Sequence, residues 1–255
     1  MTQWRMPKVD ILGVKVDRLD KTNLEHAIVT CINEKRKEVF AYVNINGVNL
    51  ARTNGAIKDF YNSRATVYCD GEGVRLGAWL LGTRLPARTV LTRWVWDLCA
   101  LCEVHMFSVF FLGGEEGTVT AAVNQVRRKF PRLRIAGAHH GYFGKEGVES
   151  DKVVEAVNNA HADLMFVALG MPAQELWIAR NMERMNVHAI LPAGSMMEYV
   201  AGRKAIAPPW MLAFGLEWLY RLGQEPARLW QRYLIGNPKF MASIILQRLR
   251  SGKST

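Results

Sequence analysis

An acidic residue set between glycines is the first feature of this chain that could carry out chemistry. Asp70-Gly71-Glu72-Gly73 follows the β-like run Thr66–Cys69, which places a carboxylate at the predicted end of a strand with little bulk around it. A carboxylate there could serve as a general base for a sugar hydroxyl. The Asp-x-Glu spacing could instead hold a divalent metal on a nucleotide diphosphate, and a turn-forming Asp explains the same pattern without chemistry.

A glycine-rich turn is the second candidate. Gly113-Gly114-x-x-Gly117 follows an apolar run and precedes a helical pattern, and the amides of such a turn can hold a diphosphate. A nicotinamide-binding turn also needs an acid at the end of the next strand, where this chain has Ala138-His139-His140. The pattern therefore favours a diphosphate site, or a simple strand-to-helix turn, over a hydride-transfer cofactor.

Three more loops rich in polar residues or glycine follow β-like runs: Asn44-Ile45-Asn46-Gly47, Gly170–Glu175 and Gly194-Ser195. In open α/β sheets, ligands bind beyond the carboxyl ends of the strands. We therefore expect these loops to meet Asp70 and Gly113 at one rim, in a site for a phosphate or a sugar. Cys99-x-x-Cys102 lies in an apolar helical run without a second cysteine pair, so we interpret it as core packing and predict no metal site.

The elements that must position these residues alternate along the chain. Short β-like runs are separated by amphipathic helical patterns up to about residue 193, and the later runs are continuously apolar. The predicted strands are Asp10–Val16, Val39–Val43, Thr66–Cys69, Phe107–Leu112, Arg132–Ala138, Leu164–Leu169 and His188–Leu191. This alternation predicts an α/β fold with a largely parallel, Rossmann-like sheet flanked by helices.

The end of the chain has a different character. Pro208-Pro209 marks a boundary, which divides the chain into an α/β body of residues 1–207 and a helical appendage of residues 208–255. Breaks in the helical pattern are predicted at Pro226 and at Gly236-Asn237-Pro238. From Arg203 onward there are nine basic and two acidic residues, interleaved with aromatic and aliphatic side chains. That apolar content favours an anionic membrane surface as the partner of the appendage, ahead of simple packing of its helices on the body, with nucleic acid third.

The composition of the chain restricts the class of protein to which it can belong. The 255 residues carry a net charge of +10, with 49% hydrophobic and 22% charged residues, which is typical of a globular protein. We see neither a secretory leader nor an apolar run long enough to span a bilayer. Together with only four cysteines, this leads us to expect a protein of the reducing cytoplasm rather than a disulfide-stabilised secreted domain.

In combination, the motifs resemble the WecG/TagA/CpsF family of bacterial glycosyltransferases, glycosyltransferase family 26. The resemblance runs from about Val9 to Phe240 and is carried by segments that follow one another in the family's order. These segments are Val43–Asn46, Cys69–Val74, Phe111–Gly114, Gly170–Trp177 and Gly215–Leu222, followed by Glu225-Pro226, Arg228 and Arg232-Tyr233.

The resemblance implies an inverting, metal-independent enzyme without a cofactor, peripheral on the cytoplasmic face of the bacterial membrane. It would transfer a sugar from a UDP-sugar to a sugar on undecaprenyl diphosphate. Asp70 takes the place of the family's proposed general base. The residues that the resemblance and the loops assign to substrate binding are Asn44, Asn46, Arg88, Gly113, Gly114, Gly170, Gln174, Glu175, Arg221, Arg228 and Arg232. Homo-oligomerisation is left open.

Two departures bear on the sugar. Many members begin the first loop with Thr-x-Asn, where this chain has Asn44-Ile45-Asn46. Many also carry Arg-Val-x-Gly-x-Asp after the Asp-Gly loop, where Arg88–Arg93 puts Leu91 for the glycine and Arg93 for the acid. The resemblance therefore groups the chain with xanthan-type exopolysaccharide glucosyltransferases. N-acetylmannosaminyl transfer in teichoic-acid or enterobacterial-antigen pathways is the alternative, and a non-catalytic membrane-binding module is a third hypothesis.

Overall fold

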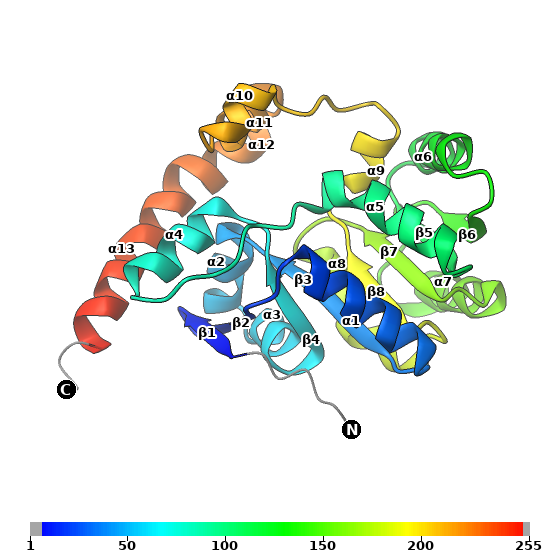
Figure 1. The fold of residues 1–255 in the computed structure, drawn as a ribbon, viewed down its shortest axis with the longest axis horizontal. Helices are drawn as coiled ribbons and strands as arrows, with labels where there is room; N and C mark the ends of the chain where they lie inside the picture. The colour runs from blue at the N-terminus through cyan, green and yellow to red at the C-terminus, as the bar shows by residue number, and fades with distance from the viewer. Residues whose placement is uncertain (1–6, 252–255) are drawn as a thin grey trace.

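The computed structural model describes residues 7–251 of the chain. At its centre lies a six-stranded sheet in which every strand pair is parallel (Figure 1). From one edge to the other the strands are β4 (Ala65–Cys69), β3 (Glu38–Val43), β8 (Ala189–Pro192), β7 (Leu164–Ala168), β5 (Ser108–Gly113) and β6 (Arg134–His139). The predicted α/β class with a parallel, helix-flanked sheet is confirmed.

Two apolar cores cover the two faces of the sheet, because successive side chains of a strand point to opposite faces. One core contains Val39 and Ala41 of β3, and the other contains Phe40. Helices of the first core are α2 (Ile45–Thr53), α3 (Gly55–Asp59), α4 (Glu72–Leu80), α7 (Gly147–Ala160) and α8 (Ala173–Asn181), with the short turns η1 (Phe60–Arg64) and η2 (Met182–Arg184). Helices of the second core are α1 (Lys21–Asn33), α5 (Leu91–Val104), α6 (Glu116–Lys129) and α9 (Met196–Val200).

The first predicted strand is wrong as a single element. Residues Asp10–Val16 belong to an antiparallel hairpin of β1 (Lys8–Ile11) and β2 (Val14–Asp17), which forms a sheet of its own. The chain reverses at Leu12 and Gly13, which have φ angles of 54° and 88°. Two consecutive residues with positive φ make the tight turn that suits the twist of a hairpin.

The appendage is helical, as predicted, and comprises α10 (Pro209–Ala213), α11 (Glu217–Gln224), α12 (Pro226–Trp230), the π-helical turn η3 (Gln231–Ile235) and α13 (Gly236–Ser251). The break before Pro226 is confirmed. The break at Gly236-Asn237-Pro238 is wrong, because α12, η3 and α13 follow one another directly. Pro238 is the third residue of α13, and proline is tolerated in the first turn of a helix.

The last helix belongs structurally to the body. Figure 1 shows an extended segment leading from α9 to α10, and α13 running beside α4. Phe240 and Ile244 of α13 are fully buried in the first core, where they pack against Gly77 of α4. Exposed apolar side chains lie on the rest of the appendage and include Trp210, Phe214, Trp230, Leu234, Leu246 and Leu249. Within residues 7–251, no helix is long and apolar enough to cross a membrane.

Candidate active site

The parallel topology brings the predicted polar loops to one rim. Asn44 follows β3, Asp70 follows β4, Gly114 follows β5, Gly170 follows β7 and Gly194 follows β8. All five line one cavity of about 810 Å³, here called the strand-end cavity. The predicted meeting of these loops is therefore present, and it follows from the shared direction of the strands.

A second cavity of about 740 Å³ lies between α4, α11 and α13 and is called the α4 cavity. Its walls include the apolar side chains of Leu76, Trp79, Leu85, Phe214, Trp218 and Met241. The strand-end cavity is lined by the basic side chains of Lys145, Lys204, Arg221, Arg228 and Arg232. The α4 cavity has basic side chains beside its apolar wall, namely Arg75, Arg84, Arg88, Arg221 and Arg232. The two cavities share the wall formed by Asn44, Asn46, Asp70, Arg221, Arg232 and Tyr233.

Asp70 is part of this shared wall. Its backbone N–H donates to the carbonyl oxygen of Val43 at 3.0 Å, which fixes the residue at the end of the sheet. Burial is the largest influence on its carboxyl group and raises the pKa above the usual 3.8, and the charge of Glu217 acts in the same direction. The guanidinium groups of Arg221 and Arg88 oppose this rise. The result is a carboxylate of increased basicity, held between two cations.

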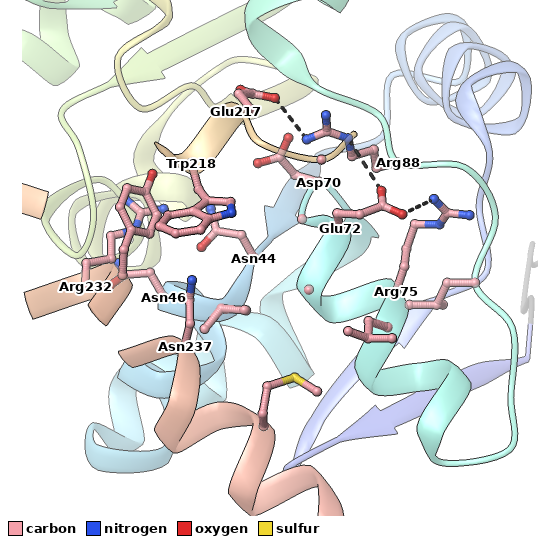
Figure 2. Close-up of a pocket in the computed structure, with 18 of the residues that line it drawn as sticks. Asn44, Asn46, Asp70, Glu72, Arg75, Arg88, Glu217, Trp218, Arg232 and Asn237 are labelled. Carbon is pink, nitrogen blue, oxygen red and sulfur yellow. Dashed lines mark hydrogen bonds and ion pairs between the residues drawn. The ribbon is translucent and has the colours of Figure 1, made fainter. Parts of the chain in front are cut away.

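An ion-pair network surrounds Asp70 (Figure 2). Glu217 of α11 lies 3.0 Å from Arg88 and 2.9 Å from Arg221, with its side chain only 15% exposed. Arg88 is also 3.6 Å from Glu72, which in turn pairs with Arg75 at 2.6 Å. The Glu72 carboxylate is thus directed to two arginines. Among the described residues no cluster of three or more His, Cys, Asp or Glu could hold a metal ion, and metal independence remains a prediction.

The other arginines of the appendage also face the cavities. Arg232 lines both, and its guanidinium carbon lies 5.5 Å from the ring centre of Tyr233. Arg228 lines the strand-end cavity while forming two hydrogen bonds to Glu225, and Glu225 also accepts a bond from Lys204 of the body. The structure therefore brings all three predicted appendage arginines to the rim that Asp70 occupies.

Gln174 and Glu175 lie behind the wall of the strand-end cavity. Gln174 is completely buried, and its amide contacts Tyr42, Gly194 and Glu175. Glu175 is 1% exposed, and burial raises the pKa of its carboxyl group to about 7, although the hydrogen bond from Gln174 acts to lower it. Both predicted binding residues are thus placed to support the wall from behind.

The two predicted glycines at the end of β5 differ in their surroundings. Gly114 lines the strand-end cavity, as Gly170 does. Gly113 faces the neighbouring strand, where an added Cβ would overlap with the backbone carbonyl of Ala168. Its φ of 132° is also a conformation that other residues rarely adopt. Gly113 thus allows β5 and β7 to approach closely and shapes the rim indirectly.

Several site residues were not predicted. Glu217 and Trp218 stand inside Gly215–Leu222, one of the segments that carry the family resemblance, so that segment could have pointed to them. Tyr42 lies within the apolar run of β3, and nothing in its sequence context distinguishes it from a core residue. Cys99 and Cys102 are buried in the second core, as the packing interpretation predicts.

Known proteins with similar sequences are glycosyltransferases. A family model described as the glycosyl transferase WecG/TagA/CpsF family matches residues 9–254. Similar proteins include the N-acetylglucosaminyldiphosphoundecaprenol N-acetyl-beta-D-mannosaminyltransferases of Staphylococcus aureus strains NCTC 8325 / PS 47 and COL. Each is 29% identical over 216 residues, which cover 84% of this chain and 84% of the relative. The matched residues span the body and the appendage, and the chain therefore belongs to the WecG/TagA/CpsF family of glycosyltransferases.

Proposed function

We propose that this enzyme transfers an N-acetylmannosaminyl group from a UDP-sugar to a sugar carried on a polyprenyl diphosphate. The observation that carries the proposal is the position of Asp70 on the wall between two cavities of different character. A transferase must hold two substrates on either side of the reacting atoms. Both cavities have basic side chains that suit a diphosphate, which donor and acceptor both carry, and the apolar wall of the α4 cavity suits the lipid of the acceptor.

The donor is assigned to the strand-end cavity. Arg221, Arg228 and Arg232 enter it from the appendage, and Gly114 and Gly170 line it without side chains. Guanidinium groups form paired hydrogen bonds with phosphate oxygens, and their charge stabilises UDP as it leaves. Arginines that gather around the leaving group can supply this stabilisation without a metal ion, which supports the prediction of metal independence.

The acceptor is assigned to the α4 cavity. Leu76 and Trp79 of α4 and Phe214 of the appendage line it and are also among the exposed apolar residues. The apolar wall therefore continues from the cavity to the surface, so a polyprenyl chain could remain in the membrane while its sugar reaches Asp70. We propose that this surface docks on the cytoplasmic leaflet, where anionic headgroups attract the basic appendage by about 1 kcal/mol for each charge near the surface.

The chemistry then takes one displacement. The Asp70 carboxylate accepts the proton of the acceptor hydroxyl while the hydroxyl oxygen forms a bond to the anomeric carbon of the donor sugar. The bond from that carbon to the diphosphate oxygen breaks, and the electron pair leaves with UDP. A single in-line displacement inverts the anomeric centre and needs only one base.

The names of the relatives favour N-acetylmannosamine over glucose. Each relative is named for transfer of an N-acetyl-beta-D-mannosaminyl group to N-acetylglucosaminyldiphosphoundecaprenol. Glucose is the second candidate, because the chain has Leu91 and Arg93 where many family members have glycine and an acid. Leu91 lines the strand-end cavity, so its side chain occupies space that a glycine would leave to the donor.

The test is release of UDP from UDP-N-acetylmannosamine and UDP-glucose, with and without a synthetic lipid-diphosphate acceptor. Release from UDP-N-acetylmannosamine that requires an N-acetylglucosaminyl lipid supports the proposal. Release that requires UDP-glucose and a glucosyl lipid supports the second candidate and an exopolysaccharide role. No release from folded protein with either donor contradicts both and leaves a membrane-surface binding module.

A further inference from the structure

Tyr42 of β3 is a polar residue of the strand-end cavity that the mechanism above does not use. It is half-buried on the wall of that cavity, and its hydroxyl oxygen accepts a hydrogen bond of 3.1 Å from Nε2 of Gln174. An added Cβ on Gly194 would lie 2.8 Å from the same oxygen. The hydroxyl thus lies at the end of β8, beside a residue that has no side chain to cover it.

The direction of this hydrogen bond is fixed by the groups around Gln174. The backbone N–H of Gly194 can only donate, and it lies 2.9 Å from Oε1 of Gln174, so that atom must be the amide oxygen. The amide nitrogen is then oriented toward Tyr42 at 3.1 Å and Glu175 at 2.8 Å, and its two hydrogens are both used. Tyr42 therefore accepts from Gln174, and its own hydroxyl hydrogen is left for another acceptor.

Within residues 7–251 the hydroxyl of Tyr42 has no acceptor for that hydrogen. Burial raises the pKa of Tyr42, so the group stays protonated and remains a donor. Glu175 supports this arrangement from behind, because its Oε1 holds the second amide hydrogen of Gln174. A donor in the wall of a ligand cavity, held in place by the hydrogen bond that its oxygen accepts, is preorganised to bond an oxygen atom of the ligand.

The residues around Tyr42 indicate which part of the ligand carries the oxygen atom that Tyr42 would bond. Three of the basic groups that suit a diphosphate, Arg221, Arg228 and Arg232, lie on the appendage, and Lys145 and Lys204 enter the cavity from loops of the body. Tyr42 is a neutral donor on the sheet side and lines the cavity together with Asn44, Asn46 and Asp70. We propose that Tyr42 binds the transferred sugar of the donor by donating its hydroxyl hydrogen to a hydroxyl or acetamido oxygen of that sugar. This inference rests on the proposed function and adds a specificity residue to it.

The test compares the affinities of UDP and of UDP-sugars for the wild type and Tyr42→Phe, measured by calorimetry. The variant should bind UDP as the wild type does, and should bind its preferred UDP-sugar about five- to ten-fold more weakly, which is typical for one lost neutral hydrogen bond. Tyr68→Phe is the matched control. Tyr68 is the register partner of Tyr42 in β4, is fully buried and has a hydroxyl without a partner among the described residues, so its loss should not change either affinity.

A second measurement removes the partner atom from the ligand. The wild type should bind one UDP-sugar analogue, which lacks a single hydroxyl or the acetamido group, about five- to ten-fold more weakly than the parent UDP-sugar. Tyr42→Phe should bind that analogue and the parent UDP-sugar with the same affinity. This arm gives a result on the wild type even where the variant folds poorly.

Three outcomes contradict the assignment. Equal weakening of UDP and UDP-sugar binding by Tyr42→Phe places the contact on the nucleotide. If Tyr42→Phe binds UDP and its UDP-sugar as the wild type does, Tyr42 bonds only water. The same holds if the wild type binds no UDP-sugar more tightly than UDP. A wild type that does not bind UDP at all overturns the proposed function as well, which separates the two failures.

Discussion

Glu217 of the appendage and Arg88 of the body form an ion pair of 3.0 Å in which both side chains are less than one-fifth exposed. The same carboxylate holds Arg221 at 2.9 Å, so one residue of α11 positions two arginines around Asp70. Water screens this largely buried pair less than an exposed one, and loss of one partner would leave buried charges without compensation. The pair therefore fixes α11 over the end of β4 and completes the site.

Replacing Glu217 with Gln should change the pH dependence of the reaction. Glu217 raises the pKa of Asp70, so its neutralisation lowers that pKa, and the acid limb of kcat/KM for UDP release should move to lower pH. The value of kcat/KM on the plateau should fall about ten-fold, because Arg88 and Arg221 lose their shared partner.

Glu72→Gln is the matched control for this variant. Glu72 also lies near Arg88, but its side chain is 49% exposed and it is not among the groups that shift the pKa of Asp70. An acid limb that moves to higher pH in Glu217→Gln, or that moves equally in both variants, would contradict the role of Glu217.

Asp70→Asn should abolish transfer and leave the fold intact. A general base contributes about 10²- to 10⁴-fold, so UDP release should fall by at least about 100-fold while UDP affinity is retained. The ionised carboxylate is disfavoured by burial, so the neutral variant should melt at the same temperature as the wild type or slightly higher. Turnover at the wild-type rate would show that another group takes the proton.

The fold and the rim could be predicted because they depend on local patterns. The apolar runs of β5 and β7 fix a buried parallel sheet, and parallel strands end at one rim, which places Asp70 beside Gly114 and Gly170. The contributions of Tyr42 and Glu217 depend on partners far away in the chain, Gln174 and Arg88. The hairpin was missed because Leu12 and Gly13 interrupt the alternation of β1 and β2 only briefly.

Glu175→Gln should make the stability less dependent on pH. Glu175 has a pKa of about 7 in the folded chain, above its usual 4.5, so the folded state keeps a proton that the unfolded state has lost between these pH values. The contribution of Glu175 to the stability should therefore fall by about 3 kcal/mol as the pH rises from 4.5 to 7, and should not change further above that. The variant has no carboxyl group at this position and should lose this fall.

Urea unfolding at pH 5 and pH 8 checks this expectation. The difference in the free energy of unfolding between the two pH values should be smaller for Glu175→Gln than for the wild type. Glu183→Gln is an exposed control on the neighbouring turn η2 and should behave as the wild type. A variant with the same pH dependence as the wild type would show that Glu175 is already ionised at pH 5.

Membrane binding is best tested with surface variants, because α13 contributes Phe240 and Ile244 to the core and a truncation after Pro208 would expose that core. Trp210 and Phe214 of the appendage are 59% and 77% exposed, and Phe214 also lines the α4 cavity. Replacing both with Glu should weaken co-sedimentation with anionic vesicles by at least about ten-fold, since burying one such side chain in the interface contributes about 1.5–3 kcal/mol.

Met106→Glu, at a residue of the body that is 75% exposed, should bind like the wild type. Loss of vesicle binding in Met106→Glu, with binding retained in the double variant, would place the membrane contact on the body and overturn the assignment of the appendage.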